Sequence, residues 1–347
     1  MKNSAQWQKT GLIVLCVILA LVLILLIFAT TYVNYLLGMI GRPPEGDDTI
    51  SPDQLASETE ETDPDYTGPT VNQGDIVIDV LPTTPVKNDS TIVNILLVGQ
   101  DRREGEGRQR SDVMLLVTFN PSKNSVTLTS FLRDTYAYVP GYGYRKLNVA
   151  YKNGGFSLLN ETLALNFGVH VDADVEVDFA GFTGIIDLLG GVDINLTQRE
   201  ADYMNKNLGF EYNKDEVWNL KAGVNHLNGS QALAYARIRK LDSDFGRTQR
   251  QRTVLVALLN AYKNQNIGTM LGLMDDILPL VSTNMTNQEI LSYVADLFPM
   301  LSGATIDTLH IPASGTYTDQ YVSGLGACLV PDLAANRSIL QELFSAD

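Results

Sequence analysis

The chain has few of the residues that build disulfide frameworks and zinc sites. Its 347 residues include two cysteines, Cys16 and Cys328, and three histidines that are widely separated. These numbers exclude a disulfide framework and a CxxC metal site, and we expect His170, His226 and His310 to be structural imidazoles rather than zinc ligands. The sequence also lacks a GxSxG elbow and a Walker lysine motif, so the enzyme classes built on them have no support.

Charge is absent between Lys9 and Arg42. Within this stretch, residues 11–30 are almost all aliphatic, and about twenty such residues span a hydrocarbon core of about 30 Å. A cleaved signal peptide would have a shorter apolar region and a small-x-small site, so a retained anchor is favoured. Lysines precede the run and acidic residues follow it. The positive-inside rule therefore predicts a single-pass protein of the cell membrane, with a cytoplasmic tail at 1–10, a transmembrane helix at 11–37 and the rest of the chain outside the cell.

Most of the net charge of −15 lies in one segment. Residues 43–91 contain twelve Asp or Glu and a single Lys, together with many Pro, Ser and Thr. Such a composition cannot bury enough apolar surface to offset the entropy of ordering, so we predict an acidic, disordered linker at 38–90. One short stretch in it, DIVIDVL at 75–81, could add an edge strand.

Strand and helix patterns alternate from Thr91 onward. Strands are predicted at residues 92–99, 112–120, 125–132, 171–179, 192–197 and 304–311. Helices are predicted at residues 147–167, 182–191, 228–236, 245–263, 268–280 and 287–300. The alternation predicts a single α/β domain at 91–311, with a central mixed β-sheet flanked by helices, followed by a C-terminal tail at 312–347.

Arginine is concentrated in two places. Residues 237–252 hold six of the 25 Lys and Arg side chains against two Asp, and residues 102–110 hold four more arginines. An acidic chain with this distribution is expected to bind a multiply charged anion, because the planar guanidinium forks onto phosphate oxygens. A solvated basic face is the alternative, although the arginines would then repel one another with few acidic neighbours.

The spacing of Arg237 and Arg239 carries structural information. Two residues apart on an α-helix, they would point to opposite faces. If both reach one ligand, the helix must end near Ala236 and the pair must be extended. A second helix would then start with Arg247 and Gln249 in its first turn, near the positive end of the helix dipole.

Carboxylates and further cations lie at the expected strand ends. Asp101 follows the first strand and Asp112 opens the second, where two carboxylates would suit Mg²⁺. Simple pairing of both with the adjacent arginines stays open as the alternative. Arg133 follows the third strand, next to Asp134, which is a candidate general base. Lys146 follows a glycine-rich turn at a helix start, where a phosphate would also meet the helix N-terminus, although an ordinary solvated lysine is the alternative.

Taken together, these motifs resemble the LytR-CpsA-Psr proteins of the Gram-positive cell envelope. The resemblance covers about residues 92–310 and is carried by five stretches in order: NILLVGQDRR at 94–103, RSDVMLLVTFNP at 110–121, FLRDTYAYVPGYGYRKLNVAY at 131–151, DFAGFTGIIDLLGGVDI at 178–194, and LNGSQALAYARIRK with DFGRTQRQR at 227–252. It departs in GQD, where a small residue more often precedes the Asp, and in FLRD, where a proline usually precedes the Arg.

The resemblance implies a membrane-anchored phosphotransferase with its domain outside the cell. Such proteins move a glycopolymer, such as teichoic acid or capsular polysaccharide, from a polyprenyl diphosphate carrier to a hydroxyl of peptidoglycan. An apolar tunnel would hold the prenyl tail. Asp101 and Asp112 would then be the Mg²⁺ ligands. The implied pyrophosphate-binding set is Arg110, Arg133, Lys146, Arg237, Arg239, Arg247 and Gln249.

Two other functions stay open at this point. A hydrolase of polyprenyl diphosphate would use the same metal and arginines with water as the nucleophile. A non-enzymatic, membrane-bound envelope regulator acting as a transcriptional attenuator is the third hypothesis, since basic clusters can bind nucleic acid. The predicted topology argues against nucleic acid as a partner, because it places the arginines outside the cell.

Overall fold

The computed structural model describes residues 30–42, 68–78, 89, 91–100, 108–209, 217–242, 244–263, 273, 275–301 and 303–345. Most of the predicted span at 11–37 and of the predicted linker at 38–90 lies outside these residues. Within the part of the chain that is described, no helix combines the length and the apolar composition needed to cross a membrane.

A six-stranded mixed sheet forms the centre of the molecule, in the order β10-β3-β2-β1-β6-β9. Its strands are β1 (Val93–Gln100), β2 (Ser111–Asn120), β3 (Ser125–Phe131), β6 (Ala173–Asp178), β9 (Ser282–Thr283) and β10 (Thr305–Ile311). The first three strands are antiparallel neighbours, whereas β6 runs parallel to β1 and β10 runs parallel to β3. The predicted α/β class with a central mixed sheet is therefore confirmed.

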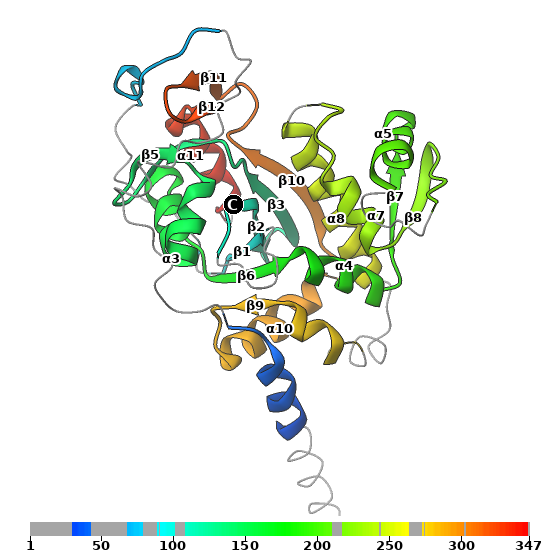
Figure 1. Ribbon diagram of the computed structural model, residues 1–347. Coiled ribbons are helices and arrows are strands. Elements are labelled where there is room, and N and C mark those ends of the chain that lie inside the picture. The colour runs from blue at the N-terminus through cyan, green and yellow to red at the C-terminus, as the bar shows by residue number, and fades with distance from the viewer. Residues whose placement is uncertain are drawn as a thin grey trace, which may run out of the picture.

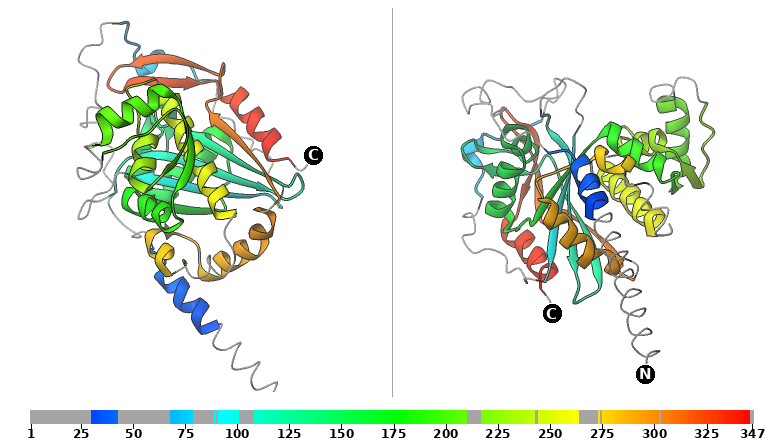
Figure 2. Two further views of the ribbon diagram at one scale, coloured as in Figure 1. Left: turned by 90° about the vertical axis from the view of Figure 1, so that its right-hand side faces the viewer. Right: turned by 90° about the horizontal axis from the view of Figure 1, so that it is seen from below.

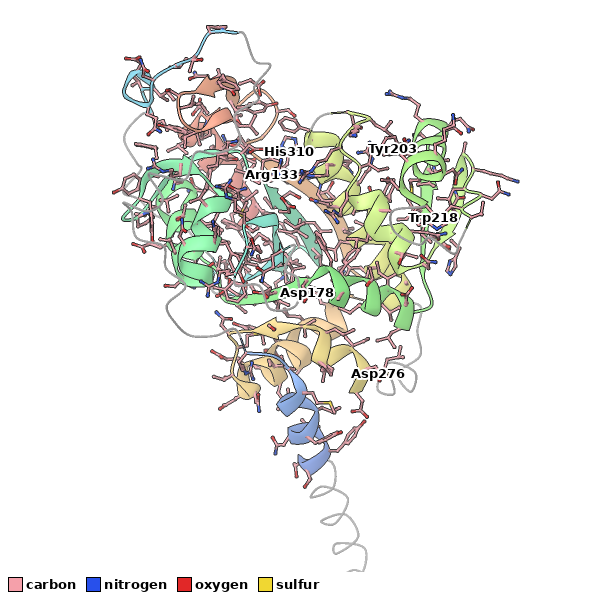
Figure 3. All side chains as sticks on the ribbon, viewed as in Figure 1. Arg133, Asp178, Tyr203, Trp218, Asp276 and His310 are labelled. Carbon is pink, nitrogen blue, oxygen red and sulfur yellow. The ribbon has the colours of Figure 1, made fainter. Side chains whose placement is uncertain are left out.

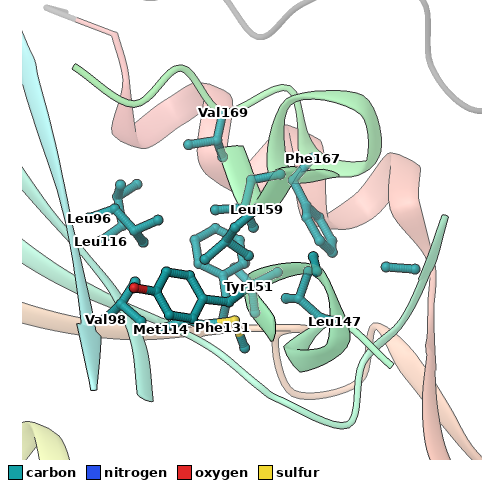
Figure 4. Close-up of a cluster of buried hydrophobic side chains, with 14 of the residues drawn as sticks. Leu96, Val98, Met114, Leu116, Phe131, Leu147, Tyr151, Leu159, Phe167 and Val169 are labelled. Atoms are coloured by element: carbon teal, nitrogen blue, oxygen red, sulfur yellow. The ribbon is translucent and has the colours of Figure 1, made fainter. Parts of the chain in front are cut away.

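Helices cover both faces of this sheet (Figure 1). One face packs against α3 (Asn148–Phe167) and α11 (Leu333–Leu343), and the other against α8 (Asp244–Lys263) and α10 (Asn287–Leu301). Successive strand residues point to opposite faces, so β1 sends Leu96 and Val98 toward α3, and Ile95 and Leu97 toward α8. Figure 4 shows the α3 side, where Leu159 and Phe167 are completely buried. Each such side chain contributes about 1.5–3 kcal/mol relative to an exposed one.

A smaller lobe with its own apolar cluster packs beside α8. It is built from α4 (Phe179–Leu188), β7 (Val192–Leu196), α5 (Gln198–Tyr203), the π-helix η2 (Met204–Leu208), β8 (Gly223–Leu227) and α7 (Gly229–Ala236). Its cluster includes the buried Trp218 and reaches Val254 of α8. Asn228 caps α7 as predicted, since its side chain accepts a hydrogen bond from the Gln231 amide at 2.9 Å. The lobe thus fixes the end of α7 against the start of α8.

Three local predictions differ from the structure. The helix predicted at 182–191 is α4, which begins three residues earlier because Asp178 caps it, accepting from the Gly181 amide at 2.8 Å. The edge strand predicted at 75–81 is not formed in its described part: residues 73–75 are the 3₁₀ helix η1 (Gln73–Asp75), and Ile76 and Ile78 pack against core clusters instead of pairing. Of the helix predicted at 268–280, the described part is short and ends in the 3₁₀ helix η3 (Leu278–Leu280).

The chain after residue 311, which we expected to be a tail, is built into the same fold. It forms the hairpin of β11 (Tyr317–Val322) and β12 (Gly326–Pro331), followed by α11. The hairpin packs on a second hairpin that the sequence did not suggest, β4 (Tyr136–Val139) and β5 (Gly143–Lys146), while Leu340 and Phe344 complete the main core. Apolar residues from this segment close the α3 face of the sheet, so the folded domain extends to residue 345.

At the other end of the chain, residues 30–39 are helical. This helix lies beside α10 in the views of Figures 1 and 2. Leu36, Leu37 and Ile40 are buried, at 6–7% exposure. The predicted linker was expected to start at residue 38, but residues 36–42 pack on the domain.

Candidate active site

Charged side chains gather at the sheet edge where β3 ends and β2 begins, the region around Arg133 in Figure 3. Because β2 and β3 are antiparallel neighbours, the start of one meets the end of the other, and Arg133 Nη1 donates to Asp112 Oδ1 at 3.0 Å. Both side chains are about a quarter exposed, so the pair itself adds at most about 1 kcal/mol of stability. The predicted meeting of these two strand ends is confirmed.

Asp134 lies between two cations. Its Oδ2 accepts from Arg133 Nε at 3.2 Å, and Lys146 Nζ lies 3.2 Å from its Oδ1. Lys146 is the last residue of β5 and not part of a helix, because α3 begins at Asn148. A carboxylate with a cation on each oxygen is well placed to orient Arg133 and Lys146. Both of its oxygens are therefore already in contact with cations.

Arg237 and Arg239 come from a break between two helices. The pair was expected to be extended, which is wrong for Arg237: it caps α7 with turn-like backbone angles, φ −98° and ψ 1°. As predicted, α7 ends at Ala236 and the next helix starts only at Asp244. Ile238, between the two arginines, is 1% exposed, whereas both arginines are exposed. The guanidinium of Arg239 lies 3.5 Å from Asp112, and that of Arg237 lies 4.5 Å above the ring of Phe179. This short segment thus buries the isoleucine and presents both arginines to one cavity, described below.

A buried ion cluster around Arg250 of α8 holds the break in place. Arg250 Nε donates to Glu200 at 2.7 Å, its Nη1 donates to the carbonyl of Ile238 at 3.2 Å, and both Nη atoms donate to the Asp242 carboxylate. Gly246 makes room for this arrangement, since a Cβ at that position would collide with the Asp242 carboxylate. Arg250 therefore fixes the backbone between the two exposed arginines.

The first turns of α8 place alternate residues in different surroundings. Arg247 is 2% exposed and lines the cavity described below, together with Gln251 one turn later. Gln249, which the sequence suggested as a ligand, is exposed, and its Oε1 accepts from Arg252 Nη2 at 2.6 Å. Residues four apart share a helix face, whereas residues two apart do not, so the glutamine beside Arg247 is Gln251.

A cavity of about 210 Å³ opens between the sheet and the smaller lobe. Its walls are mostly apolar and come from β1, β2, β6, α4, α7 and α8, through residues such as Leu97, Leu115, Phe182, Leu233 and Leu255. The polar side chains of the lining lie where the cavity meets residues 237–239, between α7 and α8. These are Asp112, Arg237, Arg239, Arg247, Gln251 and Asp178. The cavity thus combines an apolar body with a group of cations and one carboxylate that already contacts Arg239.

Burial lowers the pKa of two further side chains, Arg252 of α8 and His310 of β10. Arg252 is 4% exposed, and burial lowers the pKa of its guanidinium to about 10, which still leaves it charged at neutral pH. Burial also lowers the pKa of His310; the nearby charge of Arg252 adds to that shift, and a hydrogen bond to the Pro312 carbonyl opposes it. His310 is therefore neutral at pH 7, as expected for a structural imidazole.

Two predicted site residues are less well placed. Arg110 directly precedes β2 and is partly buried at the same sheet edge, but it is not part of the cavity lining. Asp101 lies outside the described residues. Across the described ranges, no three side chains of His, Cys, Asp or Glu come together as a ready metal site. Asp112 and Asp178 both present carboxylates at the cavity. Asp112 is the one that lies beside the end of β1, which Asp101 follows in the sequence.

The residues that sequence reasoning missed are Gln251, Phe179 and Arg250. The spacing of Arg247 and Gln251 on a predicted helix could have revealed Gln251. Phe179 had no such signal, because its contact with Arg237 joins residues far apart in the chain. Arg250 was counted among the ligand-binding cations of the basic run, and only its contacts with Glu200 and Asp242 identify it as structural.

The chain is similar to known proteins in sequence and in fold. It is 34% identical over 267 residues to "Regulatory protein MsrR" of Staphylococcus aureus (strain COL), covering 76% of this chain and 77% of that protein. It is 33% identical over 248 residues to "Polyisoprenyl-teichoic acid--peptidoglycan teichoic acid transferase TagU" of Bacillus cereus, covering 70% and 75%. The solved structure "TagT bound to LIIa-WTA" superposes with a TM-score of 0.60 at 25% identity and covers 79% of this chain and 97% of that one.

The match to a whole family is broader than any of these pairs. The model of the LytR_cpsA_psr family covers residues 55–333, which includes the sheet, the smaller lobe, the cavity and the hairpin after β10. With most of its length matched, the chain belongs to the LytR_cpsA_psr family.

Proposed function

We propose that this protein transfers a glycopolymer from a polyprenyl diphosphate carrier to a hydroxyl of peptidoglycan. The observation that carries the proposal is the cavity, whose apolar body suits a prenyl chain and whose arginines suit a diphosphate. The names of relatives point the same way, since TagU is described as a teichoic acid transferase acting on peptidoglycan and a TagT structure as bound to LIIa-WTA.

In this proposal the residues act by binding and by stabilising charge. Arg237, Arg239 and Arg247 bind the diphosphate, and Gln251 adds a hydrogen bond beside Arg247. The acceptor hydroxyl attacks the phosphorus that carries the glycopolymer. A new P–O bond to the acceptor forms, the P–O–P bond breaks, and polyprenyl monophosphate leaves with the electron pair, while the hydroxyl proton passes to the departing phosphate or to water. Negative charge grows on that leaving phosphate, where preorganised guanidinium groups stabilise it.

Mg²⁺ is the proposed cofactor. Asp112 fits as a ligand because its carboxylate lines the cavity beside two arginines, and the sequence supplies Asp101 as its partner. When bound there, the ion would neutralise phosphate charge. In its absence from Asp112, the contacts of that carboxylate with Arg133 and Arg239 keep both guanidinium groups oriented toward the same place.

The location of the reaction is also proposed, on the basis of the sequence. The uncharged residues 11–30, with lysines before them, would anchor the chain in the cell membrane and leave the domain outside, where lipid-linked donor and peptidoglycan meet. Nucleic acid is not a partner in this arrangement.

The deciding experiment follows a lipid-linked donor with a labelled polymer, in the presence and absence of peptidoglycan fragments as acceptor. The full-length protein should release polyprenyl monophosphate only when an acceptor is present and should form an equal amount of labelled peptidoglycan. Equal release without any acceptor would instead identify a polyprenyl diphosphate hydrolase.

A second candidate is favoured by one observation, the description of the similar MsrR as a regulatory protein. In that case the chain would be a membrane-bound envelope regulator without transfer activity. A reporter fused to the C-terminus decides the topology on which this depends: activity only in an extracellular reporter supports the transferase, and activity only in a cytoplasmic reporter supports the regulator.

A further inference from the structure

Residues 36–42 are joined to the domain by backbone pairing. Gly41 forms a parallel bridge with Ser282 of β9: its amide donates to the Val281 carbonyl at 3.0 Å, and its carbonyl accepts from the Thr283 amide at 3.1 Å. Gly41 therefore extends the central sheet beyond β9. A Cβ at residue 41 would collide with Ser282 Oγ and press against the Val281 carbonyl, so the close approach favours glycine.

Arg42 fastens the next residue of the chain. Its guanidinium donates to the carbonyls of Thr283 and Met285, and to Asn287 Oδ1 at 2.7 Å. These three acceptors belong to β9, to the turn after it and to the start of α10. One side chain thus ties the N-terminal segment to two elements of the domain.

The helix before this clip has one face buried and another open. Leu36, Leu37 and Ile40 pack into the domain, whereas Tyr32 and Tyr35 are 36% and 57% exposed. This helix continues the apolar run that ends at Thr30. At 1.5 Å per helical residue, Gly41 lies within roughly 15–20 Å of Thr30, where the apolar run ends. The domain is therefore fastened before the first acidic residue of the linker, Glu45.

A short chain of contacts leads from the clip to the wall of the cavity. Leu280 precedes the segment that pairs with Gly41, and its carbonyl and side chain lie against Gly181 and Gly184 of α4. The same helix supplies Phe179, Phe182 and Ile185 to the cavity lining. In Figure 1 β9 lies directly above the N-terminal helix, and α4 lies above β9.

We propose that residues 36–42 seat the domain directly on the bilayer, with the α4 wall of the cavity turned to the lipid surface. The polyprenyl tail of a donor then enters the cavity from the membrane, while its diphosphate stays at the arginines. This inference rests on the proposed function and adds a membrane-seating surface to it.

The test uses the full chain in nanodiscs and two donors, one lipid-linked in the bilayer and one with a short, water-soluble prenyl chain. The Gly41→Val variant breaks the pairing with β9. The matched control is Gly38→Val, because a Cβ at Gly38 meets nothing within 4 Å. Arg42→Gln provides a second disruption that leaves the backbone pairing sterically allowed.

Both disrupting variants should keep full activity on the soluble donor, which also reports that the domain is folded. Their rate with the bilayer donor should fall by roughly tenfold or more, because a fixed geometry is what gives the tethered domain a high effective concentration at the surface. The Gly38→Val control should match the unmodified protein with both donors. Equal rates on the bilayer donor for Gly41→Val and the control would overturn the proposal.

If the unmodified protein transfers polymer from neither donor, the proposed function is refuted but the membrane seating is not. A measurement that does not depend on activity tests the seating in that case. A dye on Leu291→Cys of α10 should show strong energy transfer to a lipid dye, and Gly41→Val should reduce it while Gly38→Val does not. Unchanged energy transfer in Gly41→Val would show that the clip does not seat the domain.

Discussion

Within the arginine-rich residues 237–252, Arg250 has different surroundings from Arg237 and Arg239. Arg250 is 5% exposed and contacts two carboxylates, Glu200 and Asp242, as well as a backbone carbonyl. Arg237 and Arg239 are exposed at the cavity, where Arg239 shares Asp112 with Arg133 and Arg237 lies over an aromatic ring. The arginines of residues 237–252 therefore do not all bind one anion. The number of carboxylates around each guanidinium distinguishes the arginine that shapes the site from those that can bind a ligand.

The largest expected effect follows from breaking the buried cluster. Arg250→Met leaves Glu200 and Asp242 without their cation and releases the Ile238 carbonyl, so the free energy of unfolding should fall by about 3–5 kcal/mol. Urea unfolding measured at equilibrium on the soluble domain gives this value. Transfer activity should fall as well, even at temperatures where the variant is folded, because Arg237 and Arg239 lose their fixed backbone.

Arg252→Met is the matched control for that variant. Arg252 lies on the same helix and is equally buried, but its one hydrogen bond in the described structure goes to the Gln249 amide rather than to a carboxylate. Replacing a buried cation that has no counter-charge by an apolar side chain should change stability by less than about 1 kcal/mol or increase it. A loss as large as that of Arg250→Met would contradict the distinction between the two arginines.

Arg237→Ala and Arg239→Ala should give the reverse pattern. Each removes a guanidinium from the cavity lining without breaking a buried pair, so unfolding should change by less than about 1 kcal/mol. Transfer should fall by about 10²–10³-fold, which is typical of losing one preorganised group that stabilises transition-state charge. Steady-state rates with saturating donor measure the loss. Full activity in both variants would remove these residues from the site.

Asp112→Asn tests whether the carboxylate between the arginines holds a metal. If it does, transfer should fall by about 100-fold, a change of about 2.7 kcal/mol in the barrier, and added Mg²⁺ should no longer raise the rate. Asp101→Ala should behave in the same way. Should Asp112→Asn keep the Mg²⁺ response of the unmodified protein, Asp112 would be only an ion-pair partner of Arg133 and Arg239.

Much of this site could be predicted because it depends on local order along the chain. Asp112 and Arg133 meet because consecutive antiparallel strands place the start of one beside the end of the other. The helix break at Ala236 followed from the two-residue spacing of Arg237 and Arg239. In each case a rule of geometry over a few residues was sufficient.

What could not be predicted depends on contacts between distant parts of the chain. Nothing near Arg250 in the sequence marks it as structural, because Glu200 lies 50 residues away and becomes its partner only through the packing of the smaller lobe. Gly41 and Ser282 are similarly remote, so residues 36–42 were assigned to a span and a linker. The hairpin after residue 311 was missed because its apolar residues complete a core formed by α3 and the sheet.

The smallest expected effect on transfer distinguishes Gln251 from Gln249, both on α8. Gln251 lines the cavity one turn after Arg247, whereas Gln249 is exposed and accepts a hydrogen bond from Arg252. Gln251→Ala should lower transfer by roughly fivefold to tenfold, the value of one neutral hydrogen bond of about 1–1.4 kcal/mol. Gln249→Ala should change it by less than twofold, and kcat/KM for both variants under the same conditions checks the pair. A larger loss for Gln249→Ala would mean that α8 rotates when the donor binds, because residues two apart on a helix cannot face the same ligand without such a change.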